Sequence, residues 1–489
     1  MRRAFATNIV LLLAVNALVK PAYLLGVDLG VQNAVGTAEY GRYAYWYSFA
    51  FLFGTVLDFG LQNYNAVTMS RRPELIRERL PVTLSLKLVL SGAYVLLMLG
   101  AAVVSGASAA DVYLAAGIVL TQVALSTWQL LRTNVAAQGK YQANSLLSVA
   151  DKAQLLLVVG VVLLYPPLSG WITIERFVLL QFGALLTAIA GTLYVMDFEA
   201  GQRWWRWDGA ELGRMLRAAA PYALTLLLSS VAARVDILMI ERLLPDGFYA
   251  AGVYMAGYRL LDALNMVSYL FATLLIPMLG SLAEKGEAVR PLLRQGAQYM
   301  LILTVGAATF LTFHAQAVTE LLYREADATW GPVLAALAWS AVGTGAMYIQ
   351  GSYLLVRQRL RLINGIFVVA SVANVVLNFV LLPRYGVWGA AVATALTQGL
   401  IGGAEWAYAE RLTQGEEGGS FRRVFFRGLV AYSAATAAVA YGCAAAGWPL
   451  WGSAIVHGLA CVLVAIGFGM VVGLSELVAR LRAAGSAQT

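Results

Sequence analysis

The stretch from Pro221 to Pro277 reads PYALTLLLSSVAARVDILMIERLLPDGFYAAGVYMAGYRLLDALNMVSYLFATLLIP. It consists of two long apolar segments joined by the short polar turn ERLLPDG. A helix needs about 20 apolar residues to cross a hydrocarbon core about 30 Å thick, and each segment is long enough. The stretch therefore predicts two consecutive membrane-spanning helices.

The rest of the chain has the same apolar character. Of its 489 residues, 60% are hydrophobic and 12% are charged. Such a sequence has too little polar surface for a soluble globular protein, and it lacks the short alternating strands of a transmembrane barrel. We therefore predict an all-α fold, that of a polytopic membrane protein.

Polar residues, glycines and prolines divide the apolar sequence into about fourteen membrane-spanning segments. We place these segments at 7–29, 40–61, 82–104, 110–131, 144–165, 175–196, 218–240, 248–277, 297–319, 332–356, 362–382, 387–409, 424–446 and 451–478. An even number of spans puts both termini on the same side of the membrane.

The basic residues of the loops predict the orientation. The loops on one side hold few of them, namely Arg42, Arg176, Arg242, Arg324 and Arg384. The other side holds most of the lysines and arginines together with both termini, so the positive-inside rule predicts that this side is cytoplasmic. The membrane thus accounts for the net charge of +8, and we expect no nucleic-acid partner.

Two pairs of similar segments indicate an internal repeat. YGRYAYWYSFAFLF aligns with AGVYMAGYRLLDAL so that Gly41 falls on Gly252. The segment 138–166 likewise resembles 357–383, and both pairs have offsets of about 210 to 220 residues. Chance repetition of small and aromatic residues in apolar sequence is the alternative explanation.

The repeat predicts two pseudo-symmetric six-helix lobes and a further helix pair. The lobes are residues 1–217 and 218–412, and the C-terminal two-helix extension is residues 413–489. Parallel halves of this kind enclose a central cavity in alternating-access transporters.

Charged residues inside the spans indicate where such a cavity would lie. A charge at the centre of the membrane costs at least ~2.5 to 3.5 kcal/mol. Lys20, Arg234 and Arg259 belong to the first, seventh and eighth segments, which open the two lobes, so we predict that they converge on a cationic substrate-binding cavity. An anionic substrate follows, and arginine suits phosphate or pyrophosphate because its planar fork donates two parallel hydrogen bonds.

Carboxylates accompany these cations. We predict that Asp236 and Asp262 act as charge partners or in ion coupling, and Asp262 lies three residues after Arg259 on the same helix face. Asp151 and Lys152, neighbours in the fifth segment, have the same predicted role. The alternative, that these charges are internal ion pairs that hold the bundle together, stays open.

Two other polar features have simpler interpretations. Asp58 and Lys87 lie near segment ends, where we expect their side chains to extend towards the membrane surface. The aromatic residues at 40–47 are typical of an interfacial belt, with a sugar-stacking surface as the alternative.

The sequence predicts no enzymatic site. It contains no Walker A motif, no spaced metal ligands and no Ser-His-Asp pattern, so we expect neither a metal nor another cofactor. No loop exceeds about twenty residues, whereas a membrane glycosyltransferase, polymerase or ligase would need a larger extramembrane loop for its catalytic residues.

Three stretches resemble a known family. They are VGTAEYGRYAYWYSFAFLFGTVLDFGL from Val35, GVYMAGYRLLDALNMVSYLFATLLIPMLGSL from Gly252, and NVVLNFVLLPRYGVWGAAVATALTQGL from Asn374. They are similar to the polysaccharide transporters of the MOP superfamily, and most similar to Wzx-type flippases, over about residues 7–410.

The resemblance implies a flippase of undecaprenyl-pyrophosphate-linked oligosaccharide, such as an O-antigen repeat unit of lipopolysaccharide or another surface polysaccharide. It implies a multi-pass protein of the bacterial inner membrane that works by alternating access, driven by a gradient of Na⁺ or H⁺. The expected partners are membrane lipids and the polymerase or glycosyltransferases of the same pathway.

Two alternatives stay open. The extra helix pair resembles that of the fourteen-helix lipid II flippases, whose substrate is the peptidoglycan precursor, and it could form a groove for the lipid tail. A MATE-type drug or cation antiporter of the same superfamily fits less well, because a cavity rich in arginine does not suit cationic drugs.

Overall fold

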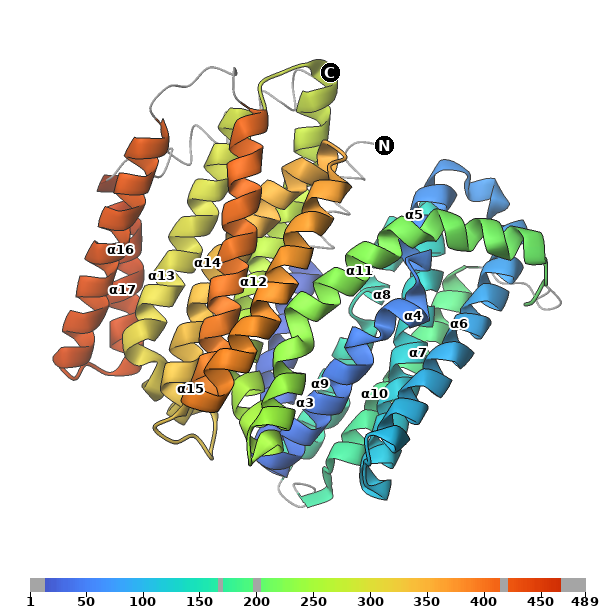
Figure 1. Ribbon diagram of the computed structural model, residues 1–489, viewed down its shortest axis with the longest axis horizontal. Coiled ribbons are helices and arrows are strands. Elements are labelled where there is room, and N and C mark those ends of the chain that lie inside the picture. The colour runs from blue at the N-terminus through green and yellow to red at the C-terminus, as the bar shows by residue number, and fades with distance from the viewer. Residues whose placement is uncertain (1–13, 166–169, 197–203, 414–420, 468–489) are drawn as a thin grey trace. The chain divides into compact units, whose positions relative to one another are not determined.

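The computed structural model describes residues 14–165, 170–196, 204–413 and 421–467. Within these ranges the chain is helical and has no β-strand (Figure 1). This confirms the predicted all-α fold. The chain divides into two compact units, the first made of Met1–Ala256 and Asn374–Val387, the second of Gly257–Ala373 and Trp388–Thr489.

The predicted lobes were defined by the internal repeat in the sequence, whereas the two units are defined by contacts between residues in the structure. The lobe boundaries at residues 217 and 412 therefore stay a prediction.

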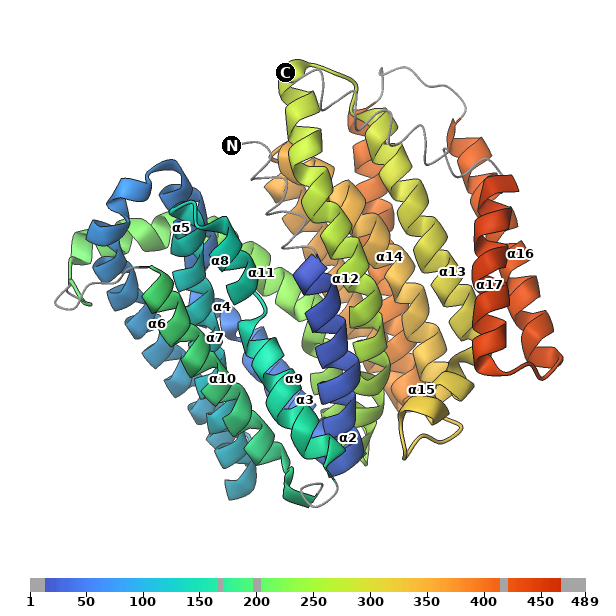
Figure 2. The same cartoon turned by 180° about the vertical axis from the view of Figure 1, so that it is seen from behind.

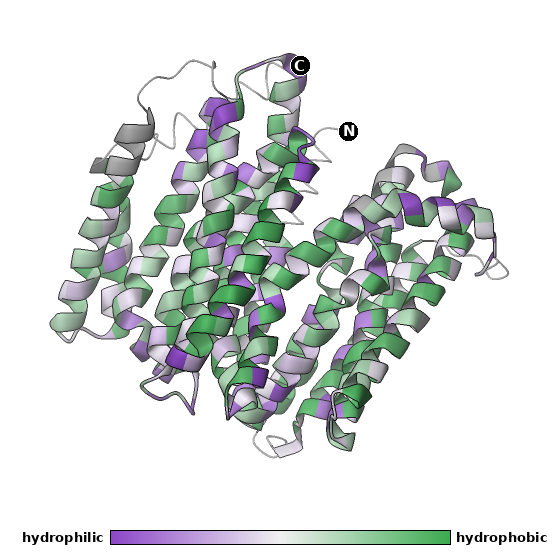
Figure 3. Cartoon of the chain, in the orientation of Figure 1, coloured by the Kyte–Doolittle hydropathy of each residue, from purple (hydrophilic) through white to green (hydrophobic). Residues whose placement is uncertain are grey.

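In the part of the chain that the structure describes, eleven helices are long and apolar enough to cross a membrane. They are Ala14–Val35, Ile76–Val104, Ala109–Ala137, Tyr141–Leu164, Ile174–Val195, Tyr222–Leu243, Gly247–Lys285, Arg290–Leu322, Trp330–Val356, Leu360–Leu412 and Gly428–Ala445. Figure 3 shows apolar residues along these helices, with hydrophilic residues most frequent near their ends.

Four of the predicted segments differ from this set. Helix α15 (Leu360–Leu412) covers two of them, and its backbone leaves the helical conformation at Gly386, with φ 59° and ψ −146°. The segment 40–61 is divided into α3 (Thr37–Leu52) and α4 (Gly54–Asp58), and the last segment is described only as α17 (Leu450–Gly467). The total of about fourteen spans stays a prediction.

The first unit is organised around α7 (Ala109–Ala137), which packs against α3, α5, α6 and α10. The N-terminal span, which contains η1 (Tyr23–Asp28) and α2 (Leu29–Val35), packs against α9, as Figure 2 shows from behind. The other helices of this unit are α5 (Leu61–Arg71), η2 (Pro73–Leu75), α6 (Ile76–Val104), α8 (Tyr141–Leu147), α9 (Ala150–Leu164), α10 (Ile174–Val195) and α11 (Gly209–Leu243).

Side-chain caps explain why three of these helices begin where they do. Ser108, Thr173 and Asp208 each accept a hydrogen bond from the backbone N–H three residues later. Each cap satisfies an N–H group that has no partner within the helix, which typically stabilises the helix by about 1 kcal/mol.

The second unit is organised around α13 (Arg290–Leu322), which packs against α14 (Trp330–Val356), α16 (Phe421–Ala445) and α17. It also contains α12 (Gly247–Lys285) from Gly257 onwards and most of α15. An apolar cluster joins α12, α13, α14 and α15, and buries residues such as Leu279, Ala297 and Ile349.

Within the first unit, α3 and the start of α12 cross at two glycines. A Cβ atom at Gly41 would overlap the carbonyl oxygen of Phe248 and would lie 2.7 Å from the amide nitrogen of Gly252. A Cβ atom at Gly252 would in turn overlap the carbonyl oxygen of Thr37. The two positions that the repeat aligns thus contact each other reciprocally, so each helix has a glycine where the other's backbone approaches.

Candidate functional site

A buried polar network surrounds Asp236 in the first unit. Asp236 is 1% exposed, and its Oδ2 accepts a hydrogen bond of 2.8 Å from the hydroxyl of Tyr254. Its Oδ1 accepts a hydrogen bond of 2.6 Å from the side-chain amide of Asn378, which also donates to Oδ1 of Asn374 at 3.1 Å. The buried carboxylate therefore has hydrogen-bond partners from α12 and α15, as a charge at this depth requires.

The network contains one buried oxygen that makes no hydrogen bond to any residue described, namely Oδ1 of Asn378. This amide oxygen lies on the side chain that bonds Asp236. A carboxylate with amide oxygens close by is the donor set that hard cations prefer.

Arg234 lies two residues before Asp236 on α11 but meets different groups. Its Nη1 lies 3.7 Å from Sδ of Met255, and its guanidinium carbon lies 5.7 Å from the ring centroid of Phe51. The aromatic face attracts the cation through its quadrupole.

The second unit holds the other predicted pair. Arg259 is 3% exposed, and Asp262 follows it on α12 by about one turn. Asp262 also interacts electrostatically with Tyr348 on α14. The pairing of Arg259 with Asp262, and the convergence of Lys20, Arg234 and Arg259 on one cavity, stay predictions.

Lys20 lies within a cluster of charged side chains in the first unit. It interacts electrostatically with Asp151, Lys152 and Arg132. Nζ of Lys152 lies 3.3 Å from Oδ2 of Asp151 and 4.5 Å from the ring centroid of Tyr23. Lys20 thus interacts with two other cations and one carboxylate, which leaves its surroundings with an excess of positive charge.

An interruption between two consecutive helices positions the carboxylate of Asp151. Helix α8 ends at Leu147 and α9 begins at Ala150, so Asp151 lies in the first turn of a new helix. The unpaired N–H groups of a helix N-terminus stabilise a negative charge there. On the other side of the break, Ser148 accepts a hydrogen bond of 2.9 Å from the side-chain amide of Asn16.

Sequence reasoning assigned no role to Arg132, which it placed in a cytoplasmic loop. Its guanidinium carbon lies 5.1 Å from the ring centroid of Trp128, and its Nη2 donates to the carbonyl of Asn144 at 3.4 Å. Arg132 also lines a polar cavity of about 320 Å³ together with Gln62, Gln129, Thr133, Tyr141 and Asn144. Only the packing of α5, α7 and α8 brings these residues together.

The expectation for Lys87 was wrong. Its side chain is buried inside the first unit, where it donates 3.0 Å to the carbonyl of Leu57 and also bonds the hydroxyl of Ser126. Nζ lies 3.9 Å from Asp58 at the end of α4. Lys87 thus binds the exposed carbonyl end of a short helix, where the helix dipole favours a cation.

The interfacial belt at 40–47 was also wrong, because most of these aromatic side chains are packed inside the first unit. Tyr40, Tyr43, Tyr45 and Trp46 are each no more than 5% exposed. The hydroxyl of Tyr43 bonds the side chain of Gln181 on α10. These rings therefore fill a core between helices.

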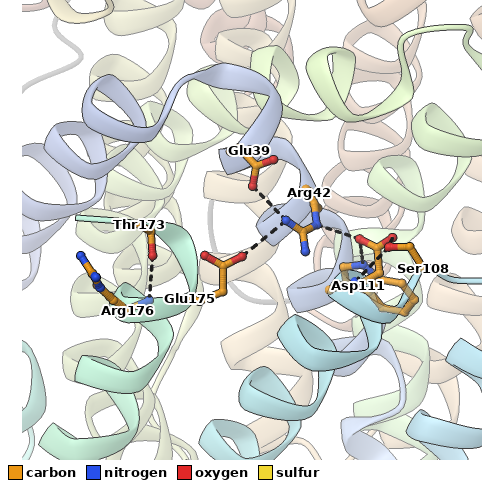
Figure 4. A network of polar contacts seen from close by, with 8 residues as sticks. Glu39, Arg42, Ser108, Asp111, Thr173, Glu175 and Arg176 are labelled. Atoms are coloured by element: carbon orange, nitrogen blue, oxygen red, sulfur yellow. Dashed lines mark hydrogen bonds and ion pairs between the residues drawn. The ribbon is translucent and has the colours of Figure 1, made fainter. Parts of the chain in front are cut away.

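Arg42 links three segments of the first unit (Figure 4). Its Nε lies 2.7 Å from Asp111, and its Nη1 lies 3.0 Å from Glu39 and 3.5 Å from Glu175. Ser108 also donates to Asp111 at 2.6 Å. In the predicted orientation all of these residues lie at the outer end of the helices, and the sequence had given Arg42 no partner.

The second unit contains an apolar groove of about 610 Å³ between α13, α14, α15 and α16. Its lining includes Leu301, Trp339, Gly343, Gly402, Trp406 and Leu429, with Glu410 and Arg411 at the end of α15. Glu410 binds Arg290 at 2.5 Å and Arg294 at 3.4 Å. The groove therefore combines an apolar length with a charged end.

Two family models match the sequence. The family described as "Polysaccharide biosynthesis protein" matches residues 5–283. The family described as "Lipid II flippase MurJ" matches residues 153–466. Each match covers more than half of the chain. The chain matches none of the curated protein sequences with which it was compared.

Solved structures share the fold at low sequence identity. A lipid II flippase MurJ in an inward closed conformation superimposes with a TM-score of 0.68 at 13% identity, covering 92% of this chain and 98% of the other. An inward-facing MATE family multidrug transporter gives 0.62 at 12% identity, with coverages of 80% and 94%. A MOP superfamily transporter from Pyrococcus furiosus gives 0.59 at 13% identity, with coverages of 83% and 95%.

These families consist of flippases and transporters, so the chain is a multi-pass membrane transporter rather than an enzyme. Its matches to two flippase families and its shared fold have one explanation. The chain belongs to the families described as "Polysaccharide biosynthesis protein" and "Lipid II flippase MurJ", it is a flippase or transporter of a lipid-linked substrate, and its fold is similar to that of MOP superfamily transporters.

Proposed function

We propose that the protein moves an undecaprenyl-pyrophosphate-linked oligosaccharide, the repeat unit of O-antigen or of another surface polysaccharide, across the bacterial inner membrane by alternating access. The match of residues 5–283 to the polysaccharide biosynthesis family carries this proposal. That region contains Lys20 and Arg234, two of the three cations that we assign to the substrate.

The pyrophosphate is the part of the substrate that these cations bind. Lys20, Arg234 and Arg259 are the proposed contacts, and Lys152 and Arg132 add positive charge around Lys20. Asp151 and Asp262 partly neutralise their neighbours, so that the cations can release the substrate after translocation.

The lipid tail is assigned to the apolar groove of the second unit. The groove is lined mainly by α14 and α15, with Leu429 from α16 at its edge. A polyprenyl chain would bury its apolar surface there, while the sugar and pyrophosphate remain in the polar part of the transporter.

Ion coupling is assigned to the network around Asp236. The carboxylate and the unpartnered Oδ1 of Asn378 offer oxygens to Na⁺, and the carboxylate could instead accept H⁺. In either case the cation would weaken the hydrogen bonds from Tyr254 and Asn378, which join α11 to α12 and α15.

The same proposal covers location and partners. Both termini lie in the cytoplasm, and the polymerase and glycosyltransferases of the same pathway supply or consume the lipid-linked glycan.

A lipid II flippase is the second candidate. The MurJ family model matches residues 153–466, which include most of the second unit and the residues that line its groove. The MATE-type antiporter is less well supported, because the first unit concentrates cations around Lys20.

Complementation tests the choice between substrates. Wild-type protein should restore surface glycan to a strain that lacks its own oligosaccharide flippase, and should fail to support growth when the lipid II flippase is depleted. The reverse result would favour the second candidate.

Substitutions test the site. Arg234→Ala and Arg259→Ala should each abolish glycan export while immunoblots show unchanged protein levels. Arg176→Ala is the matched control, because this arginine lies in the first turn of α10 and bonds the carbonyl of Trp171 just before that helix. Wild-type glycan output from both Arg234→Ala and Arg259→Ala would refute the assignment of the cations.

A further inference from the structure

The second unit contains a buried carboxyl group that neither the substrate site nor the groove uses. Glu405 lies on α15 and is 1% exposed. Its Oε2 is buried and makes no hydrogen bond to any of the residues described. A buried carboxylate without a hydrogen-bond partner or a cation is strongly disfavoured relative to the neutral acid.

The packing of α14 against α15 encloses this carboxyl group. A Cβ atom at Gly351 would lie 2.8 Å from Oε2 of Glu405, so the carboxyl group lies directly against the backbone of α14. One turn earlier on α15, a Cβ atom at Gly402 would overlap the carbonyl oxygen of Gly343. The two helices are thus in backbone contact beside Glu405, which excludes water from the carboxyl group.

No charged group in the surrounding elements compensates Glu405. Helix α14 carries no Lys, Arg, Asp, Glu or His, and its titratable residues are Tyr348 and Tyr353. The charged residues at this end of the neighbouring helices include Arg290, Arg294, Glu410, Arg411 and also Arg361, which lines a pocket together with Ala404 and Tyr408. The first three form ion pairs with one another, and Arg411 lies over the ring of Tyr408.

We propose that Glu405 is a proton-binding site that links the conformation of the second unit to pH. The carboxyl group is a neutral acid while α14 and α15 are packed together. When the two helices separate, water reaches the group, the O–H bond breaks, and the proton passes to water to leave the carboxylate. Glu405 lies seven residues before the end of α15, or about 10 Å along the helix axis, so the path to that end is short.

Through this group, a proton gradient would drive the change between the two conformations. A proton that binds more tightly to one conformation than to another shifts the balance between them. The inference rests on the chain's being a transporter and does not depend on which substrate it carries.

Infrared spectroscopy of the full-length protein in lipid nanodiscs tests the protonation state. We expect the C=O band of a protonated carboxyl group at neutral pH, shifted by D₂O, and we expect that band to be lost in Glu405→Gln. Glu410→Gln is the matched control, because Glu410 lies on the same helix and is ion-paired, so the band should persist. A band equally strong in wild type and Glu405→Gln would overturn the proposal.

Spin labels on α14 and α15 test the link to conformation. The distance between them should lengthen from mildly acidic to alkaline pH in the wild type and in Glu410→Gln, and should stay constant in Glu405→Gln. A pH response that survives in Glu405→Gln would refute the link. If Glu405→Gln does not fold, Glu405→Asp keeps an acid one methylene shorter, and its carboxyl band should move rather than disappear; an unmoved band would again refute the assignment. Neither measurement uses the glycan, so a wrong substrate assignment would leave both results unaffected.

Discussion

Replacing Gly41 with alanine should destabilise the protein, because the backbones of α3 and α12 meet at this position. The added Cβ atom would overlap the carbonyl oxygen of Phe248 and would lie 2.7 Å from the amide nitrogen of Gly252. Both are backbone atoms of a helix, which cannot turn away as the end of a flexible side chain can. The helices must therefore move apart or bend.

Two opposing contributions, overpacking and helix propensity, determine how much the free energy of unfolding changes. Overpacking costs about 1 to 3 kcal/mol, and contact with a backbone atom places Gly41→Ala near the upper end. Alanine in a helix is about 1 kcal/mol more favourable than glycine. The net loss is therefore about 2 kcal/mol in the free energy of unfolding, which changes the ratio of folded to unfolded protein about 30-fold.

Gly92→Ala is the matched control. Gly92 lies inside α6, and a Cβ atom there would meet nothing within 4 Å. This substitution should stabilise the protein by up to about 1 kcal/mol, since only the helix propensity changes.

Unfolding by sodium dodecyl sulfate in mixed micelles, followed by tryptophan fluorescence, measures both changes. Gly252→Ala should behave like Gly41→Ala, and the double variant should lose less than the sum, because one separation of the helices relieves both contacts. If Gly41→Ala were as stable as Gly92→Ala, the close crossing of α3 and α12 would be wrong.

Three further predictions concern charged groups of the first unit. Lys87→Met should lower the free energy of unfolding by about 1 to 3 kcal/mol, because it leaves the carbonyl of Leu57 and the partly buried Asp58 without their cation, and adding Asp58→Asn should restore part of the loss in the same assay. Arg42→Gln should cost about 2 kcal/mol through its lost bonds to carboxylates, whereas Arg176→Gln should change stability by less than about 0.5 kcal/mol; equal effects would contradict the role of Arg42. Asp236→Asn should remove the dependence of glycan export on the ion gradient at unchanged protein level, and a retained dependence would exclude this carboxylate from coupling.

The sequence was sufficient for the features that depend on local composition. Apolar runs of about 20 residues predict helices wherever they occur, because a backbone inside a membrane must satisfy its own hydrogen bonds. The alignment of Gly41 with Gly252 likewise came from the sequence, since close backbone approach leaves room only for glycine on each helix. The first result follows from a requirement that each segment meets by itself, whereas the second was visible in the sequence only because the segments repeat.

The expectations for Lys87 and for the aromatic residues at 40–47 failed for a common reason. Position near the end of a span suggests contact with the membrane surface, but it does not reveal what other helix covers that end. Lys87 bonds residues of α4 and α7. The aromatic rings lie against α7, α10 and the start of α12.

The partners of the buried charges were decided only by the tertiary structure. The sequence required Asp236 to have partners, because an unpaired charge at that depth is too costly, but Asn378 lies 142 positions away. Arg42 similarly reaches Asp111 and Glu175, which lie 69 and 133 positions away. Helical periodicity determines which residues share a face over a few turns, whereas contacts between distant helices depend on how whole helices pack. The sequence by itself therefore determined that this protein is a helical membrane transporter with charges that need compensation, and the packing of its helices decided which residues compensate them.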